Sequence, residues 1–331
     1  MSTGALYPLT FLPILKERVW GGRRLNELYR KQLPPAIPIG ESWEISDRAG
    51  DISVVTNGAF AGKDLHWLVE NLGADLLNGA KLKDRRFPLL IKILDASDKL
   101  SLQVHPPESK AQLLGGEPKT ELWYMAEARP GAELYVGLRQ GCTREQFTEK
   151  LKDGSVAECF HRLPVKAGDA MFLPSGRVHA LGAGMVIFEI QQNSDTTYRV
   201  FDWNRAGLDG KPRELHVNQS LESIDFSDFE PGPLRATELA GSKKVRSLLR
   251  DELFSVDVVV LHNAEAVPLS TGLMRIIGVV RGELGVRYAS GHLNLSAGQF
   301  CLIPAGLANV SLEATGQQTE CLCVRTGNGD L

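Results

Sequence analysis

Two short stretches of the sequence carry residue types that can hold a metal ion. The first is residues 168–179 (GDAMFLPSGRVH), which predict a strand, a tight turn and then His179. The second is Gln103-Val104-His105, where alternate residues of a strand face the same side, so the amide oxygen of Gln103 and the imidazole of His105 can converge. Glu121 would add a carboxylate. Two imidazoles, a carboxylate and an amide oxygen suit Zn²⁺ or a similar divalent cation, and a set without thiolates is typical of catalytic sites.

The spacing within these stretches matters, because a single histidine in a strand is more often a core or surface residue than a ligand. The positions of Gly168, Pro174, Gly176 and His179 resemble the second sequence motif of the cupin barrels. Residues 103–105 together with Glu121 resemble the first cupin motif, although a histidine is more usual where Gln103 stands. Two separate segments therefore agree on one kind of site.

The surrounding sequence resembles one cupin family in particular, the type I mannose-6-phosphate isomerases in their short bacterial form. The resemblance runs from about residue 7 to the C-terminus. The segments that carry it are 40–46 (GESWEIS), 88–94 (PLLIKIL), 100–106 (LSLQVHP), 119–124 (KTELWY) and 189–203 (EIQQNSDTTYRVFDW).

This resemblance implies a mainly β fold of two cupin (jelly-roll) barrels with a few inserted α-helices. It also implies interconversion of mannose 6-phosphate and fructose 6-phosphate through a cis-enediol, without a redox cofactor. One Zn²⁺ per chain would be held in the N-terminal barrel by Gln103, His105, Glu121 and His179. The expected partner is a small sugar phosphate, and both a monomer and a dimer remain open.

Four further residues are candidates for contact with the substrate. Arg199 matches the family's active-site arginine and would hold the enediolate or a substrate oxygen, whereas its spacing alone equally allows a surface ion pair with Asp195 or Asp202. Lys119 precedes Glu121 by two residues, so in an extended segment both face the cavity. There Lys119 would bind phosphate or, with a pKa lowered by nearby positive charge, move a proton. Lys92 is a second phosphate candidate, or else one solvated side chain of an apolar strand, and Ser101 shares a strand face with Gln103.

Short β-rich runs separated by turn residues dominate the chain and indicate a barrel or jelly roll. Strands are predicted at 87–94, 99–104, 133–137, 169–173 and 185–191. Helices are predicted at 65–80, from a capping box at Thr143 through Leu151, and at 215–224. A Pro- and Gly-containing segment at 229–233 suggests a linker between a catalytic domain, 1–232, and a second domain, 233–331.

The C-terminal part repeats the second cupin motif without its ligand. Residues 298–309 (GQFCLIPAGLAN) reproduce the spacing of 168–179, but Asn309 stands where His179 would be. His292 lies in a Ser-Gly-His turn and is expected to be exposed. The second domain is therefore predicted to be a degenerate cupin without metal ligands.

Composition narrows the class of protein. The chain has 331 residues and a formal net charge of −3, which gives no basis for nucleic-acid binding. No stretch approaches the roughly 20 apolar residues needed to cross a bilayer, so a cytoplasmic enzyme is expected. The five cysteines lack CxxC spacing and are expected to be buried free thiols.

Two functions of other kinds stay open. One is a different metal cupin enzyme, either a cupin-type glucose-6-phosphate isomerase or an oxygenase, because the same ligands could serve Fe²⁺. The other is a sugar-binding cupin that has lost turnover. The second is disfavoured because the whole set Gln103, His105, Glu121, His179 and Arg199 is present.

Overall fold

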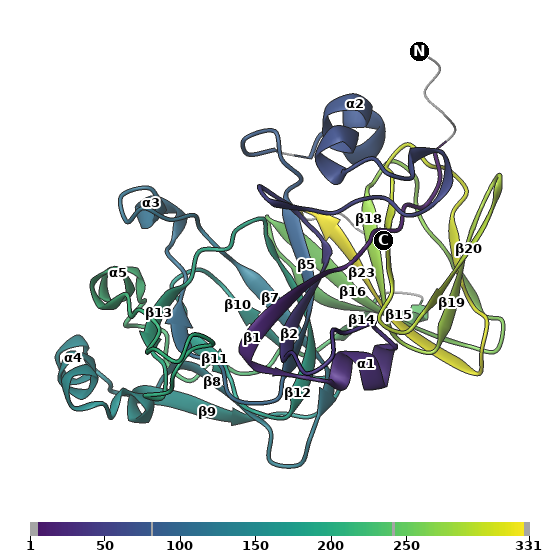
Figure 1. Cartoon of the computed structure of the whole chain (residues 1–331). Coiled ribbons are helices and arrows are strands. Elements are labelled where there is room, and N and C mark those ends of the chain that lie inside the picture. Colours follow the sequence, from purple (N-terminus) through teal and green to yellow (C-terminus); the bar gives the residue numbers. More distant parts are fainter. Residues whose placement is uncertain (1–5, 81, 240–241, 328–331) are drawn as a thin grey trace.

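The computed structural model describes residues 6–80, 82–239 and 242–327. Strands dominate and form two β-sandwiches that lie side by side, the first from the purple-to-teal part of the chain and the second from the green-to-yellow part (Figure 1). The predicted mainly β class with a few helices is confirmed. No helix among the described residues is long and apolar enough to cross a membrane.

The first sandwich consists of two facing antiparallel sheets. In order, sheet 1 contains β1 (Ile14–Gly22), β2 (Ile39–Ile45), β5 (Leu89–Ala96), β12 (Met185–Gln192), β7 (Glu121–Ala128) and β10 (Ala170–Leu173). Sheet 2 contains β13 (Tyr198–Phe201), β6 (Leu102–Val104), β11 (His179–Leu181), β8 (Glu133–Leu138) and β9 (Phe160–Pro164). A two-stranded ribbon joins β3 (Asp47–Arg48) and β4 (Asp51–Ile52).

The second sandwich is built in the same way from the C-terminal strands. Sheet 3 contains β14 (Thr237–Leu239), β15 (Ser242–Arg250), β16 (Phe254–His262), β23 (Gln318–Thr326), β18 (Arg275–Arg281) and β21 (Phe300–Ile303). Sheet 4 contains β17 (Ala266–Pro268), β22 (Ser311–Ala314), β19 (Glu283–Tyr288) and β20 (Gly291–Ser296).

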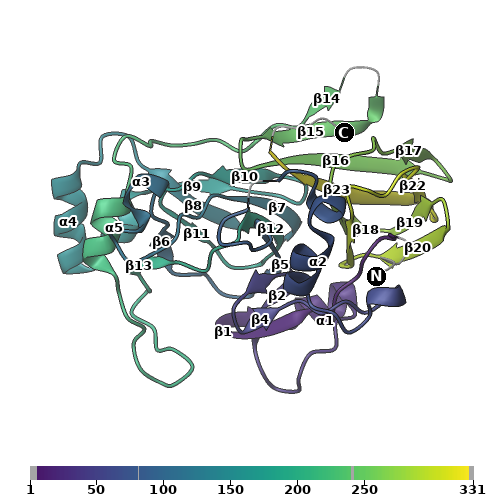
Figure 2. The same cartoon turned by 90° about the horizontal axis from the view of Figure 1, so that it is seen from above.

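Helices are short and lie outside the sheets. They are α1 (Arg24–Tyr29), α2 (Leu65–Leu77), α3 (Glu108–Ala111), α4 (Arg144–Asp153) and α5 (Val217–Ser223), with 3-10 turns at Gly58–Phe60 and Val156–Cys159. The capping box predicted at Thr143 is present at the start of α4, and α2 ends at Leu77 because Asn78 adopts the left-handed conformation. Helices α3, α4 and α5 gather at the end of the first sandwich that lies farthest from the second (Figure 2).

Strand alternation explains how the layers are assembled. On β12, Ile187 packs in the interior of the first sandwich, whereas Phe188 and Ile190 join the large apolar core that also contains Val256 and Leu322 of sheet 3. Sheet 1 is therefore an inner layer, with sheet 2 on one face and sheet 3 on the other. This is why β2 and β5 are buried along their whole length.

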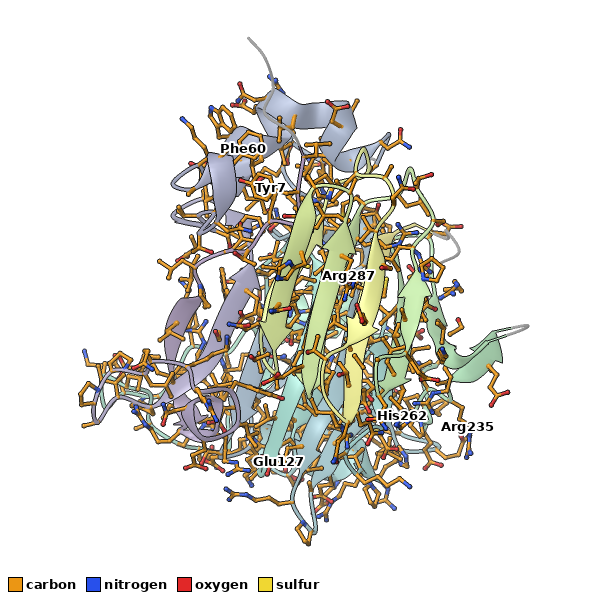
Figure 3. All side chains as sticks on the ribbon, turned by 90° about the vertical axis from the view of Figure 1, so that its right-hand side faces the viewer. Tyr7, Phe60, Glu127, Arg235, His262 and Arg287 are labelled. Atoms are coloured by element: carbon orange, nitrogen blue, oxygen red, sulfur yellow. The ribbon has the colours of Figure 1, made fainter. Side chains whose placement is uncertain are left out.

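The N-terminal segment is bonded to the second sandwich, whereas the segment between the two sandwiches is bonded to the first. Near the N-terminus Leu9 exchanges backbone hydrogen bonds with Leu302 of β21, and the ring of Tyr7 stacks on Phe60 at 5.7 Å (Figure 3). The segment predicted as a linker is held along the first sandwich, because Glu230 N donates to Leu138 O and Leu234 N donates to Ala170 O. The division into domains at 232/233 stays a prediction.

Replacing Phe188 with alanine tests whether the seam between the sandwiches stabilises the whole chain. The Phe188 ring is fully buried, 5.8 Å from the Tyr29 ring and 5.3 Å from the Phe300 ring. We expect Phe188→Ala to lower the free energy of unfolding by about 3–5 kcal/mol in urea titration, through lost burial and the cavity left behind. Leu113→Ala, at a side chain that is 88% exposed, is the control and should change little. A loss below about 1 kcal/mol for Phe188→Ala would contradict this view of the seam.

Candidate active site

Strand register brings three of the predicted residues into one row on sheet 2. Gln103 of β6 is directly opposite His179 of β11 on one side and Arg199 of β13 on the other. Residues that are directly opposite in an antiparallel pair share a face of the sheet. The turn after β10 is fixed to the same place, because Gly176 N donates to His105 O at 2.9 Å.

Glu121, the first residue of β7, faces this row from sheet 1. Its Oε1 lies 3.2 Å from His179 Nε2 and its Oε2 lies 3.6 Å from His105 Nε2. One ligand atom from each of the three residues lies within 4.8 Å of the others, and the three side chains are at most 1% exposed. Across the described residues, only this His/Cys/Asp/Glu group has such spacing.

The hydrogen bonds of the two imidazoles fix which nitrogen carries the proton. His105 Nδ1 lies 2.8 Å from Thr196 O, and His179 Nδ1 lies 2.9 Å from Arg177 O. A carbonyl oxygen only accepts, so each Nδ1 is the donor and each Nε2 keeps a lone pair toward Glu121. Burial lowers the pKa of His105 to about 3, which keeps the ring neutral. Backbone carbonyls orient metal-ligating histidines in this way.

These donors fit a divalent cation. Glu121 Oε1 is buried without a hydrogen-bond donor and Oε2 has only the Lys119 ammonium beside it, so two acceptor oxygens face two imidazole lone pairs. The Gln103 amide lies 3.2 Å from His179 Nε2, and a half-turn of that amide directs its oxygen to the same centre. His105, Glu121, His179 and Gln103 are therefore the residues that could hold a metal ion.

Lys119 points into the same cluster. Its Nζ lies 2.6 Å from Glu121 Oε2 and 3.2 Å from His105 Nε2. Burial alone would lower the pKa of Lys119, but the carboxylates of Glu121 and Glu189 outweigh burial and raise it. From the sequence we expected nearby positive charge to lower the pKa of Lys119, so the shift is opposite in direction to the one expected.

A cavity of about 540 Å³ opens beside this cluster. All the predicted substrate contacts line it, together with one predicted ligand: Lys92, Ser101, Gln103, Lys119 and Arg199. The remaining wall includes Arg18, Glu41, Glu189 and Arg213, and residues 207–209 of the loop between β13 and α5. His105, Glu121 and His179 do not line the cavity themselves but contact Gln103 and Lys119, which do. The predicted site residues therefore lie together.

Among the described cations of this cavity, Arg199 is distinguished by its charge environment. Lys92 lies 3.0 Å from Glu189, Arg18 lies 2.8 Å from Glu41, and Arg213 lies 2.6 Å from Asp202. The Arg199 guanidinium donates only to Glu214 O, at 2.7 Å, and its Nε is buried without a partner. Neither Asp195 nor Asp202 forms the surface ion pair that the sequence left open. Burial, followed by the charge of Arg213, lowers the pKa of Arg199.

Two buried carboxylates of the cavity were not predicted as site residues. Glu189 accepts a hydrogen bond from Trp123 Nε1 at 2.9 Å and is paired with Lys92, which is only 4% exposed. The alternative of a solvated Lys92 is therefore wrong. Glu41 accepts from Trp43 Nε1; burial would raise the pKa of Glu41, but Lys92 and Arg18 lower it to about 2. The only feature of the sequence that could have indicated Glu41 and Glu189 as site residues is an acidic residue within an apolar strand.

The chain is similar to known phosphomannose isomerases. The family model described as phosphomannose isomerase type I, catalytic domain, matches residues 9–129. The mannose-6-phosphate isomerase ManA of Bacillus subtilis is 36% identical over 310 residues, covering 92% of this chain and 96% of that protein. The chain belongs to the type I phosphomannose isomerase family. A second member from that organism, the probable mannose-6-phosphate isomerase GmuF, is 33% identical over 93% of this chain and 97% of its own length.

Solved structures of phosphomannose isomerases share the fold. The crystal structure of the mannose 6-phosphate isomerase from Bacillus subtilis superposes with a TM-score of 0.85 at 28% identity, covering 96% of this chain and 99% of that one. A putative mannosephosphate isomerase from Archaeoglobus fulgidus gives a TM-score of 0.75 at 22% identity over 98% of this chain and 100% of its own, which supports the fold alone.

The second sandwich departs from the first at the corresponding position. Asn309 is exposed with a φ of 56°, and His292 is exposed as expected. All five cysteines are buried free thiols, which confirms the prediction.

Metal binding should stabilise the protein through His179 and not through Asn309. We expect Zn²⁺ added to chelator-treated protein to raise the melting temperature, since a ligand at 100 times its Kd adds about 2.7 kcal/mol of stability. Differential scanning fluorimetry should show this rise in Asn309→Ala and show little of it in His179→Ala. An equal rise in both variants would place the binding elsewhere.

Proposed function

We propose that this protein interconverts mannose 6-phosphate and fructose 6-phosphate. The observation that carries the proposal is one cavity in which a neutral-imidazole and carboxylate cluster lies beside an arginine without a carboxylate partner. The family relationship supports the substrate, because relatives that cover more than nine-tenths of the chain are named mannose-6-phosphate isomerases.

Zinc is the proposed metal, one ion per chain, held by Gln103, His105, Glu121 and His179. Two imidazoles with oxygen donors and no thiolate suit zinc in a catalytic site. When bound, such an ion supplies Lewis-acid polarisation of substrate oxygens.

Aldose–ketose conversion moves a proton from C2 to C1 while negative charge develops on the enediolate oxygens. Glu189 is the proposed proton carrier, because it is a carboxylate that lines the cavity, held in place by Trp123 Nε1 at 2.9 Å and by Lys92 at 3.0 Å. Glu41 is a poorer carrier, since a pKa of about 2 keeps it ionised. Lys119 contributes a positive charge near the developing anion, because its raised pKa keeps the ammonium protonated and leaves no lone pair to accept a proton.

Arg199 is the proposed anchor for an anionic part of the substrate, either the enediolate or the phosphate. A guanidinium keeps its charge and presents several donors to an anion. Ser101 is 4% exposed and lines the cavity, where its hydroxyl would bind a sugar oxygen. Lys92 as a phosphate ligand stays a prediction; its 3.0 Å contact with Glu189 favours a role in holding that carboxylate.

A coupled assay with mannose 6-phosphate tests this function. We expect fructose 6-phosphate to form, chelator to abolish its formation and Zn²⁺ to restore it. Arg199→Met should retain the metal and lose about 10²-fold or more in kcat/KM, because a charge-stabilising donor is removed. His179→Ala should lose both metal and activity, as measured by elemental analysis beside the assay.

Arg213→Met is the matched control, since Arg213 also lines the cavity but is neutralised by Asp202. Its loss should be at least tenfold smaller than that of Arg199→Met. A fully metallated wild-type protein without turnover would reject the mannose 6-phosphate assignment while leaving the metal site in place. Oxygen consumption would then indicate a cupin oxygenase.

A further inference from the structure

Gln191 is a fully buried polar residue next to the candidate metal cluster that the proposed mechanism does not use. It lies near the end of β12, directly opposite Glu121 of β7. The register is regular from Ile187 to Gln191, so Gln191 and Glu121 share the face of sheet 1 that looks toward sheet 2. The next residue on that face, Glu189, lines the cavity.

The orientation of the Gln191 amide is set by two backbone carbonyls. Nε2 donates to Gln192 O at 2.8 Å and to Ser194 O at 2.5 Å. Carbonyl oxygens only accept, so the reverse orientation would place Oε1 against two oxygens. Oε1 is consequently turned away from both carbonyls, and it is buried without a hydrogen-bond partner.

The backbone that Gln191 holds leads directly to the orienting partner of His105. Two residues after Ser194, the carbonyl of Thr196 accepts from His105 Nδ1 at 2.8 Å. Ser194 is linked to the same residue, because Thr196 N donates to Ser194 Oγ at 3.2 Å. One buried amide thus lies beside ligand Glu121 and fixes the turn that orients ligand His105.

Because Gln191 Oε1 has no hydrogen-bond partner, the glutamine is not the side chain that would stabilise the fold most at this position. A buried acceptor without a donor costs about 1–3 kcal/mol, and an apolar side chain of the same length avoids that cost. The two bonds from Nε2 are the compensating gain, and both act on the segment 192–196.

We propose that Gln191 is a positioning residue of the metal centre, setting the orientation of His105 through the Ser194–Thr196 turn. This inference rests on the metal-binding part of the proposed function. Removal of the amide takes the side-chain donor from the Ser194 carbonyl and leaves the Gln192 carbonyl with Ser194 N alone, so the segment 194–196 shifts and the His105 ring loses its fixed direction. The Thr196 carbonyl is the outer partner of His105, and such partners typically contribute 10–100-fold in metal affinity.

The test compares Gln191→Met with Tyr124→Phe in the full chain. Tyr124 is three residues after Glu121 on the same strand and donates a buried hydrogen bond to Glu320 at 2.6 Å, but it faces the seam. Tyr124→Phe therefore removes buried polar bonding from β7 without touching the metal centre. Zn²⁺ affinity is measured by chelator competition. The visible spectrum of Co²⁺-loaded protein reports the coordination geometry of the bound metal, and the melting temperature reports the stability of the chain.

We expect Gln191→Met to weaken Zn²⁺ binding at least tenfold and to change the Co²⁺ spectrum. Tyr124→Phe should lower the melting temperature while leaving affinity and spectrum as in the wild type. If Gln191→Met does not fold, Gln191→Asn, whose amide is one methylene too short to reach both carbonyls, takes its place with the same expectation. Wild-type affinity and spectrum in the Gln191 variant would overturn the inference and leave the metal site intact. A wild-type chain that binds neither metal would overturn the site as well as the inference.

Discussion

The pairing of the short strand β6 with its two neighbours is the constraint on which the site depends. Because β6 runs between β11 and β13, its register places Gln103 between His179 and Arg199 on one face of sheet 2. A slip of one residue would turn each of these side chains to the opposite face. The register is secured at both ends of the row: Gly176 N donates to His105 O, and Arg199 O accepts from His216 N. Metal donors and the unpaired arginine are therefore set by the same backbone hydrogen bonds.

Burial then imposes a balance of charge on the cavity. An isolated ion is costly to bury, and buried charges are paired wherever the chain supplies a partner. Glu41, Glu189 and Asp202 each neutralise a basic residue of the wall. Arg199 has only a carbonyl and an unsatisfied Nε, so its positive charge stays available for an anion. The same reasoning applies to Glu121: its Oε2 is paired with the Lys119 ammonium, whereas its Oε1 faces His179 Nε2 and has no cation beside it.

The second sandwich supports this site without entering it. Its sheet 3 covers the outer face of sheet 1, so β7 and β12 alternate between an apolar seam and a polar interior. Phe188 packs into the seam while its neighbour Glu189 faces the cavity, and Tyr124 donates across the seam to Glu320. Asn309, which stands where the repeated motif would have a histidine, is exposed.

The spacing of residues within short segments predicted those donors of the site that lie close together in the chain. The distance from Gly168 to His179 and the alternation Gln103–His105 predicted inward-facing donors, and the capping box at Thr143 predicted α4. Helix α1 was not predicted, because its six residues carry no side-chain cap. Glu189 and Gln191 were not predicted as parts of the site for a different reason. Each is a polar residue in an apolar strand, and pairing with the neighbouring strand determines which face of the sheet it occupies. Their position depends on pairing with β7, some 65 to 70 residues earlier in the chain. The donors of a site are thus encoded in short motifs, whereas the groups that balance charge and orient those donors are encoded in strand register, which a local pattern does not contain.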